Sequence, residues 1–442
     1  MNLIPQPIDD LSQEKRSALM RRSMEDVSSE YDYVRGLVRN VRERGDAAVV
    51  EGLREVGEKI ESGRLEVMPE EISAACRRVD GRVLEALRVA ARNITRFHRA
   101  QREREMWSVE VAEGILAGRI TRPMDRVGCY VPGGRAAYPS TTLMTVIPAR
   151  VAGVREIVAV TPAGGEGDIP DVTLAALDIA GCDRVFRAGG PWGIAALAYG
   201  TETVPKVDKI VGPGNRYVTA AKMIVYGEVD IDSPAGPSEA LILADDTGDP
   251  EILALDFLSQ TEHDPDSAAI LVTTSPDLAA RVCEWIESRA ASLPRKEIIE
   301  RSVAAHSHVL VARDLDQAVE FANDYAPEHL QIITRDPFIV LNRIRHAGSI
   351  FLGPYSPVPA GDYASGTNHV LPTGRTARMF SGLSVDDFIK KPTFQYLSRD
   401  GLEGLKETIV TLAEAEGLPI HARAVEARFR KESDDTGHGP SS

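Results

Sequence analysis

Apolar positions in the N-terminal part of the chain recur at the spacing of helices. In the range 31–53 they return every three or four residues, which is the stripe of a helix that packs one face inward. Gly45 interrupts this range, and glycine is a common helix terminator, while Asp46 after it can cap the next helix. The charge-rich helical pattern extends from about residue 12 to residue 101.

From residue 126 onward, short apolar runs alternate with helical segments. This alternation predicts parallel sheets that are covered by helices on both faces. There is too much of it for one sheet of ordinary size, so we expect an α/β protein with two such units. The expected runs and the helices after them are 126–131 and 142–154, 156–161 and 171–180, 184–188 and 194–199, 208–211 and 216–226, 240–244 and 250–261, 268–273 and 278–292, 309–311 and 315–323, with a last run at 330–333.

The C-terminal part returns to a helical pattern. From residue 391 onward, Leu402, Leu405, Ile409 and Leu412 form an apolar stripe. The last residues, 431–442, are polar and contain Gly, Pro and Ser, which predicts a disordered tail.

Charge and cysteine content narrow the function classes. The 442 residues include 51 basic and 66 acidic side chains, a formal charge of −15. This deficit argues against nucleic acid or an anionic membrane as the main partner, because both require positive charge. The four cysteines lie far apart without paired spacing, and neither a secretory signal nor an apolar run of roughly 20 residues is visible, so we expect a cytoplasmic protein.

Two glycine-containing loops follow expected strands. Tyr130-Val131-Pro132-Gly133-Gly134-Arg135 lets the backbone approach a ligand closely, although an ordinary turn explains it equally well. In Gly212-Pro213-Gly214-Asn215, Asn215 can cap the next helix, whose amides favour a phosphate or carboxylate. Without a G-x-G-x-x-G motif, a standard dinucleotide domain is not predicted.

Other motifs gather residues suited to metal binding and proton transfer. Gln260 and His263 lie three residues apart and so share a helix face that a zinc ion could use; a solvated helix end is the simpler alternative. Glu328 and His329 at a strand start can supply two proton-transfer groups with different pKa values. The polar loop 361–373 costs conformational entropy and buries little, which favours a functional role.

Taken together and in order, these segments resemble the histidinol dehydrogenase family over nearly the whole chain. The matching stretches are VGCYVPGG, VDKIVGPGN, IDSPAGPSE, LSQTEHDPDS, YAPEHLQI, GDYASGTNHVLPTG and AEGLPIHARAV. The resemblance implies an NAD-dependent, zinc-containing enzyme of histidine biosynthesis. Such an enzyme oxidises L-histidinol through L-histidinal to L-histidine with two NAD.

The resemblance also implies catalytic and metal-binding roles. Glu328 and His329 match the acid/base pair of the family. The zinc ligands of the family, one zinc per subunit, match Gln260, His263, Asp362 and His421.

Further residues match substrate and cofactor positions of the family. Ser238, His369 and Glu416 match substrate contacts that act beside the acid/base pair and the zinc ligands. We expect a homodimer in which Glu416 and His421 are contributed across the interface. The positions that hold NAD match Tyr130, Asn215 and Trp192, and at the last of these the family often has Gln. An indole cannot replace the amide hydrogen bonds of Gln, but it could stack on a ring.

The family fold has two incomplete Rossmann-like parallel-sheet domains with smaller helical N- and C-terminal segments, which agrees with the α/β pattern above. The expected divisions are an N-terminal helical segment 1–25, a first Rossmann-like domain from 26–128 and 238–385, a second from 129–237, a C-terminal helical dimerisation segment 386–430 and the disordered tail 431–442.

Two other functions stay open at this point. A related zinc- and NAD-dependent dehydrogenase of another alcohol, such as a sulfonated propanediol, would not need groups that recognise imidazole; Glu416 and His421 favour histidinol. A zinc-dependent hydrolase would use the metal to activate water and would not need a nicotinamide.

Overall fold

The computed structural model describes residues 3–22, 27–60, 63–133, 137–164, 167–234, 236–289 and 293–429. Gly134 and Arg135 of the first glycine-containing loop and the expected disordered tail lie outside these ranges. The chain divides into two compact units. The first unit is Met1–Arg102 with Pro123–Phe388, and the second is Glu103–Arg122 with Ile389–Ser442.

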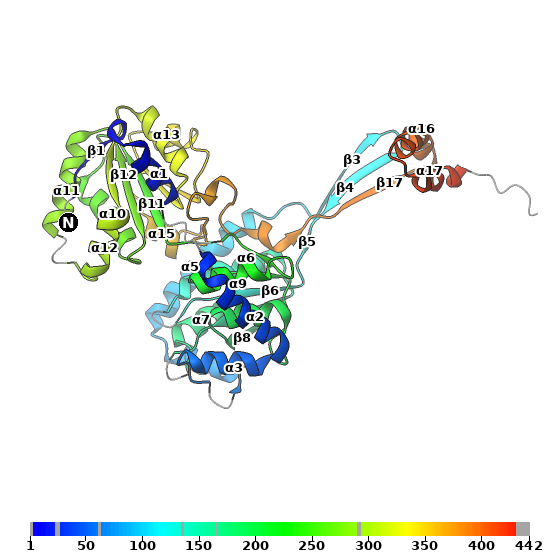
Figure 1. Ribbon diagram of the computed structural model, residues 1–442, viewed down its shortest axis with the longest axis horizontal. Coiled ribbons are helices and arrows are strands. Elements are labelled where there is room, and N and C mark those ends of the chain that lie inside the picture. Colours follow the sequence, from blue (N-terminus) through cyan, green and yellow to red (C-terminus); the bar gives the residue numbers. More distant parts are fainter. Residues whose placement is uncertain are drawn as a thin grey trace, which may run out of the picture. The chain divides into compact units, whose positions relative to one another are not determined.

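Sheet A of the first unit is parallel and is covered on both faces (Figure 1). Leu241 and Leu243 of one strand pack against the helices α1 and α13, whereas Ile242 and Ala244 between them pack against α10, α11 and α12. The described strands, in spatial order, are β1 (Gln6–Pro7), β13 (His308–Val311), β12 (Ala268–Thr273), β11 (Glu239–Ala244), β14 (His329–Ile333) and β15 (Ser349–Leu352). The helices are α1 (Gln13–Arg21), α13 (Leu315–Tyr325), α10 (Pro250–Thr261), α11 (Pro276–Arg289) and α12 (Lys296–His306).

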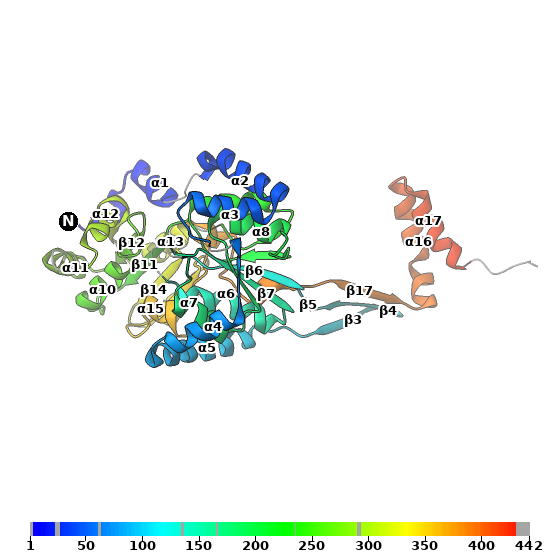
Figure 2. The same cartoon turned by 90° about the horizontal axis from the view of Figure 1, so that it is seen from below.

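Sheet B, also in the first unit, is parallel except for the antiparallel pairing of β2 with β8. In order, its described strands are β10 (Asp230–Ile231), β9 (Lys209–Val211), β6 (Arg126–Tyr130), β7 (Glu156–Thr161), β8 (Arg184–Arg187) and β2 (Glu66–Val67). Figure 2 shows helices on both of its faces. One face carries α2 (Tyr31–Arg44), α3 (Asp46–Glu55), α8 (Gly190–Tyr199) and α9 (Arg216–Val225), and the other carries α4 (Pro69–Arg78), α5 (Gly81–Ala100), α6 (Pro139–Ala152) and α7 (Asp171–Ala180).

The N-terminal helices pack differently from the sequence-based division. We grouped 26–128 with 238–385, the range that forms most of sheet A. In the structure Val34 and Val49 share a hydrophobic cluster with Val160 of sheet B, and Ile94 shares another with Ile157. The helices of 31–100 therefore cover sheet B, because their apolar stripes match its two faces. The helical periodicity of the N-terminal part shows that these helices pack one face inward, but not on which sheet.

The described part of the second unit contains an antiparallel sheet and two α-helices. The described strands are β17 (Thr393–Leu397), β4 (Ile115–Ile120) and β3 (Met106–Ala112), followed in the chain by α16 (Arg399–Ala415) and α17 (Pro419–Glu426). The prediction of helix from residue 391 onward is wrong for β17, and β3 and β4 were not predicted. The alternation of apolar and polar residues in 107–111 is the signal that indicates β3. Across both units, no helix of the described ranges is long and apolar enough to span a membrane.

Candidate active site

The Glu328-His329 motif lies at the amino edge of sheet A. His329 is the first residue of β14 and pairs in register with Ala240 of the neighbouring strand β11. This register places Glu328 beside Glu239, the residue before Ala240, and beside Ser238. The parallel pairing therefore brings together two motifs that are about ninety residues apart in the chain.

The carboxylate of Glu328 is buried and held by two donors. The hydroxyl of Ser238 and the backbone N–H of Glu239 both donate to its Oε2 atom, at 2.8 Å each. The side-chain amide of Gln260 donates in turn to the Ser238 hydroxyl at 2.9 Å. Glu328, Ser238 and Gln260 are therefore one connected group, which fixes the carboxylate in a single orientation.

His329 is buried between two carboxylates. Its Nδ1 atom lies 3.0 Å from the carbonyl oxygen of Glu239, and its Nε2 atom lies 3.6 Å from Oδ1 of Asp362. Burial disfavours the charged imidazole, but the carboxylates of Glu328 and Asp362 outweigh it and raise the pKa of His329 well above its ordinary value. Nε2 has no hydrogen-bond partner among the described residues. The side chain can thus take up a proton on Nε2 and hold it.

Asp362 and His369 belong to the polar segment 361–373. Asp362 lies in the short helix α15 (Val358–Tyr363), and its backbone carbonyl is 2.9 Å from Nδ1 of His369. Burial opposes ionisation of Asp362, but the imidazoles of His329 and His369 outweigh it and lower the pKa of Asp362. Nε2 of His369 lies 3.2 Å from the hydroxyl of Thr141 on α6, so this segment joins the edge of sheet A to a helix of sheet B.

Gln260 and His263 lie at the carboxyl end of α10. Gln260 is buried in the last turn and His263 is exposed just beyond it. The carboxyl end of a helix carries partial negative charge, which favours a cation. His263 also interacts electrostatically with Asp362. An imidazole nitrogen, a carboxylate oxygen and an amide oxygen form a donor set that suits zinc, so the residues present fit this metal.

The remaining expected ligand belongs to the second unit. His421 lies in α17, and Glu416 follows α16; both side chains are exposed. Within the described ranges, no group of three or more His, Cys, Asp or Glu side chains is arranged to hold a metal. Of the expected zinc ligands, the first unit supplies Gln260, His263 and Asp362.

The expected NAD contacts lie at the carboxyl edge of sheet B. Tyr130 ends β6, its side chain is buried, and its hydroxyl accepts a hydrogen bond from the backbone N–H of Gly190 at 3.2 Å. Burial raises the pKa of Tyr130 to about 12, so it stays a neutral phenol. The chain runs β6, β7, β8 to one side and then returns to β9 on the other side of β6, which is the kind of switch point where open α/β sheets bind ligands.

The loop after β9 packs closely against the end of β6. Gly212 has φ +120°, and a Cβ there would collide with the backbone of Tyr130. Asn215 caps α9, since its side-chain oxygen accepts from the N–H groups of Tyr217 and Val218 at 3.1 and 3.2 Å. The cap predicted from the sequence is therefore confirmed. Lys222 and Asp232 form a buried ion pair that binds the backbone of Gly212. The Asp232 carboxylate accepts from the N–H of Gly212, and the Lys222 ammonium donates to its carbonyl. The sequence pattern did not indicate this contact.

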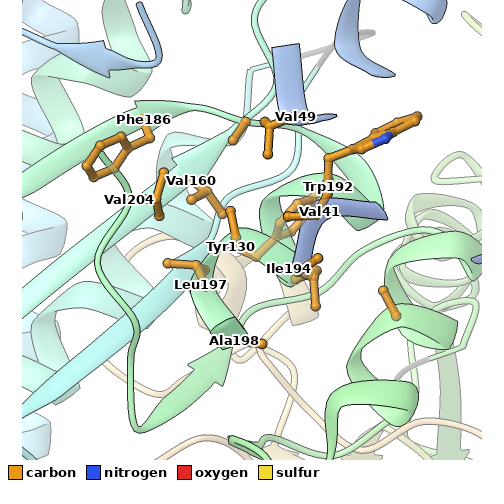
Figure 3. Close-up of a cluster of buried hydrophobic side chains, with 14 of the residues drawn as sticks. Val41, Val49, Tyr130, Val160, Phe186, Trp192, Ile194, Leu197, Ala198 and Val204 are labelled. Atoms are coloured by element: carbon orange, nitrogen blue, oxygen red, sulfur yellow. The ribbon is translucent and has the colours of Figure 1, made fainter. Parts of the chain in front are cut away.

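Trp192 lies in the hydrophobic cluster between sheet B and helices α2, α3 and α8 (Figure 3). Its side chain is 6% exposed, and its Nε1 atom occupies the space that a Cβ at Gly52 of α3 would need. The indole thus packs α8 onto α3. Contact of its exposed edge with a nicotinamide cofactor stays a prediction.

Sequence reasoning missed the charged partners of the Glu328-His329 motif. Glu239 is fully buried and forms an ion pair with Arg22, a residue just after α1. The available signal is the position of Glu239 at the start of a strand that is apolar throughout, because a charge that enters such a strand requires a counterion.

Comparison with known proteins shows the family of the chain. The family model described as histidinol dehydrogenase matches residues 20–429. The histidinol dehydrogenase of Methanothermobacter thermautotrophicus is 52% identical over 417 residues, 94% of this chain and 97% of the relative, and that of Methanosarcina mazei is 48% identical over 424 residues, 96% and 97%. The crystal structure of histidinol dehydrogenase from Elizabethkingia anophelis superposes with a TM-score of 0.91 at 38% identity and covers 97% of this chain and 98% of its own. The chain belongs to the histidinol dehydrogenase family of NAD-dependent oxidoreductases.

Proposed function

We propose that the chain oxidises L-histidinol through L-histidinal to L-histidine with two NAD, at the end of histidine biosynthesis in the cytoplasm. The observation that carries this proposal is the buried imidazole of His329, which lies between two carboxylates. Its Nδ1 atom is 3.5 Å from Glu328, and its Nε2 atom is 3.6 Å from Asp362 and has no hydrogen-bond partner among the described residues. A group of this kind accepts a proton from an alcohol as a hydride leaves. The family supplies the substrate class and the cofactor.

Gln260, His263 and Asp362, together with His421 of the partner subunit, would hold one zinc ion in each site. When bound, zinc would orient the substrate through its imidazole and amino groups. The donor atoms of the first unit and the carboxyl end of α10 support this assignment.

His329 acts as the base in both oxidations. The carbonyl of Glu239 lies 3.0 Å from Nδ1, so the neutral imidazole carries its proton on Nδ1 and leaves Nε2 as the accepting atom. Nε2 takes the hydroxyl proton of the alcohol in the first step. The carboxylates of Glu328 and Asp362 stabilise the imidazolium that forms. This proton passes to solvent before Nε2 accepts again in the second oxidation.

Glu328 assists the attack of water on the aldehyde. Its carboxylate is fixed by Ser238 and the N–H of Glu239, so one oxygen is committed to these donors and the other can accept a proton from water. Ser238 and His369, with Glu416 across the interface, would contact the substrate. These groups keep the reactive aldehyde in the site between the two steps.

Tyr130 and Asn215, with Trp192, would hold NAD, which serves as the hydride acceptor. The absence of a side chain at Gly212 lets the loop after β9 pack directly on the backbone of Tyr130, so the ends of β6 and β9 lie together at the edge proposed for NAD. Asn215 caps α9, and the positive N-terminal end of this helix dipole favours an anionic group.

A homodimer would complete the site. All seven residues of β3 are exposed within the second unit, among them the large apolar side chains of Met106, Trp107, Val109 and Val111. Ile420 of α17 is also exposed, next to His421. Apolar surface of this extent is typical of a protein–protein interface.

The test is NADH formation from L-histidinol before and after chelation, with zinc then added back. We expect two NADH for each histidinol, loss of activity on chelation and recovery with zinc. NADH from another alcohol but not from histidinol would support the related dehydrogenases, and hydrolysis without NADH would support a zinc hydrolase.

Two histidine variants test the assignment of the base. His329→Asn should lower kcat by roughly 100- to 10,000-fold while zinc content stays unchanged, because it removes one general base. His306→Asn is the control, since this imidazole is 31% exposed beside Asp266, outside the site. Unchanged turnover in His329→Asn would refute the assignment.

A further inference from the structure

Glu239 contacts the Glu328-His329 motif through three of its own groups. Its backbone N–H donates to Oε2 of Glu328 at 2.8 Å, and its Oε1 atom accepts from the backbone N–H of Glu328 at 3.2 Å. Its carbonyl oxygen lies 3.0 Å from Nδ1 of His329. Any rotation or shift of Glu239 therefore moves the acceptor of the imidazole and the donor of the carboxylate at the same time.

The side chain of Glu239 is fully buried and is paired with Arg22. The guanidinium donates to both carboxylate oxygens, and its own side chain is only 4% exposed. Burial raises the pKa of Glu239, and the charge of Arg22 opposes this rise. Loss of Arg22 would thus leave a buried carboxyl that takes up a proton and loses its fixed orientation.

Arg22 also holds the backbone that leads into the motif. Its Nη1 atom donates to the carbonyl of Tyr325 at 2.8 Å, and the guanidinium lies 3.5 Å from the centre of the Tyr325 ring. Nη2 is 3.4 Å from the carbonyl of Ala326, a residue with φ +49° in the left-handed region. One guanidinium therefore fixes both strands that meet at the site: β11 through Glu239, and the turn into β14 through Tyr325 and Ala326.

An ordinary structural ion pair is the simpler explanation, and the same helices already contain one. Arg16 of α1 contacts Asp324 of α13 at 2.8 Å, with side chains 43% and 51% exposed. That exposed pair joins α1 to α13 without desolvating a charge. A second, fully buried pair adds little net stability, because desolvation offsets most of the attraction. The Arg22–Glu239 pair differs from an ordinary structural ion pair in its contacts with the Glu328-His329 motif.

We propose that Arg22 and Glu239 form a positioning pair that sets the Glu328 carboxylate and the His329 imidazole in their reactive orientation. This inference rests on the acid/base roles proposed above. The pair makes no contact with the reacting atoms and acts only through the two residues that do.

The test compares Arg22→Gln, Arg22→Lys and Glu239→Gln with the control Arg16→Gln in the full-length, zinc-loaded enzyme. For Arg22→Gln and Glu239→Gln we expect kcat to fall roughly 10- to 100-fold, the effect of a small misplacement of catalytic groups. KM for histidinol should stay within about twofold and zinc content should not change, because substrate binding is retained. Arg22→Lys should recover part of kcat, and Arg16→Gln should match the wild type.

A lowered Tm with unchanged kcat in the Arg22 and Glu239 variants would overturn the inference, because that is the behaviour of a purely structural pair. If Arg22→Gln does not fold, Arg22→Lys still tests the inference, because it keeps the charge. An unchanged kcat in Arg22→Lys would overturn the inference, and a severalfold loss of kcat with unchanged KM would support it. Full turnover in His329→Asn would instead refute the acid/base assignment itself. An inactive His329→Asn beside fully active Arg22 variants would refute only the positioning pair.

Discussion

The carboxyl group of Glu58 has no basic partner among the described residues. It is half-buried, and its Oε2 atom accepts from the backbone N–H of Ala163, just after β7, at 3.0 Å. Burial raises the pKa of Glu58 to about 7, and the hydrogen bond from Ala163 opposes the rise. The native state therefore binds a proton between about pH 4.3 and pH 7 that the unfolded chain has released.

Because the native state loses this proton as pH rises, the free energy of unfolding falls. The contribution of Glu58 is fully present below about pH 4.3 and is lost as pH passes 7. Glu58→Gln cannot ionise, so we expect it to be as stable as the wild type at pH 4.5 and more stable at pH 8, by about 1–2 kcal/mol after allowance for partial exposure. Urea unfolding at the two pH values measures this, and an equal difference at both would exclude the buried charge as the cause.

At the same scale, the residues that the sequence motifs single out are brought together by the structure, whereas their charged partners could not be predicted. Ser238, Glu328, His329 and Asp362 stand in recognisable motifs, and the structure brings them together. The counterion Arg22 stands in an unremarkable charged helix end. It reaches Glu239 only because sheet A folds residues 217 positions apart into contact. Local patterns do not contain that information.

Helices α3 and α8 contact each other through a small residue on one helix and a large residue on the other. Gly52 of α3 faces the indole of Trp192 of α8, and a Cβ at Gly52 would overlap Nε1. Gly52→Ala should therefore destabilise the protein by about 1–3 kcal/mol through overpacking. In the background of Trp192→Gln, which removes the indole, the same change should be neutral or stabilising by up to about 1 kcal/mol, because alanine favours helix more than glycine.

A double-mutant cycle of thermal unfolding measures the coupling. Gly36→Ala in α2 is the control, since nothing lies within 4 Å of a Cβ at that position. The same loss for Gly52→Ala in both backgrounds would show that the indole is not what limits the space.

Elements with strong periodicity were predicted closely, and elements without a buried face were not. β7, α7, α10 and β12 begin and end at the predicted residues. The strand β3 was missed because its signal is the short alternation in 107–111 and not an apolar run, since all of its residues are exposed in its own unit. The helix stripes of 31–100 were recognised, yet their assignment to sheet B depends on which apolar face they meet, and periodicity does not specify that.

At the scale of the whole molecule, the unit that carries Glu416 and His421 has little core of its own. Ala413 and Ala422 are buried there, whereas Leu412, Leu418 and Ile420 are 41–68% exposed. A helical hairpin with such a surface gains stability when a second copy covers it. This is the physical basis for expecting His421 to act in the partner subunit.

Subunit complementation tests this expectation directly. His329→Asn and His421→Asn each remove one essential group, so each homodimer should be nearly inactive. If His421 completes the site of the partner subunit, a mixed dimer has one site with both substitutions and one site with neither. Random assembly of equal amounts makes half of the dimers mixed, so co-expression should restore about a quarter of the wild-type sites.

The alternative gives a different number. If His421 served the site of its own subunit, every site in the mixed dimer would contain one substitution, and co-expression would restore nothing. Zinc content checks the ligand assignment separately, because His421→Asn should lower occupancy in its homodimer whereas His329→Asn should not. As a control, His306→Asn co-expressed with His329→Asn should give about half of the wild-type activity, because the former leaves every site that it builds intact. A quarter of the wild-type activity, against none, would place the catalytic unit of this protein at the junction of two chains.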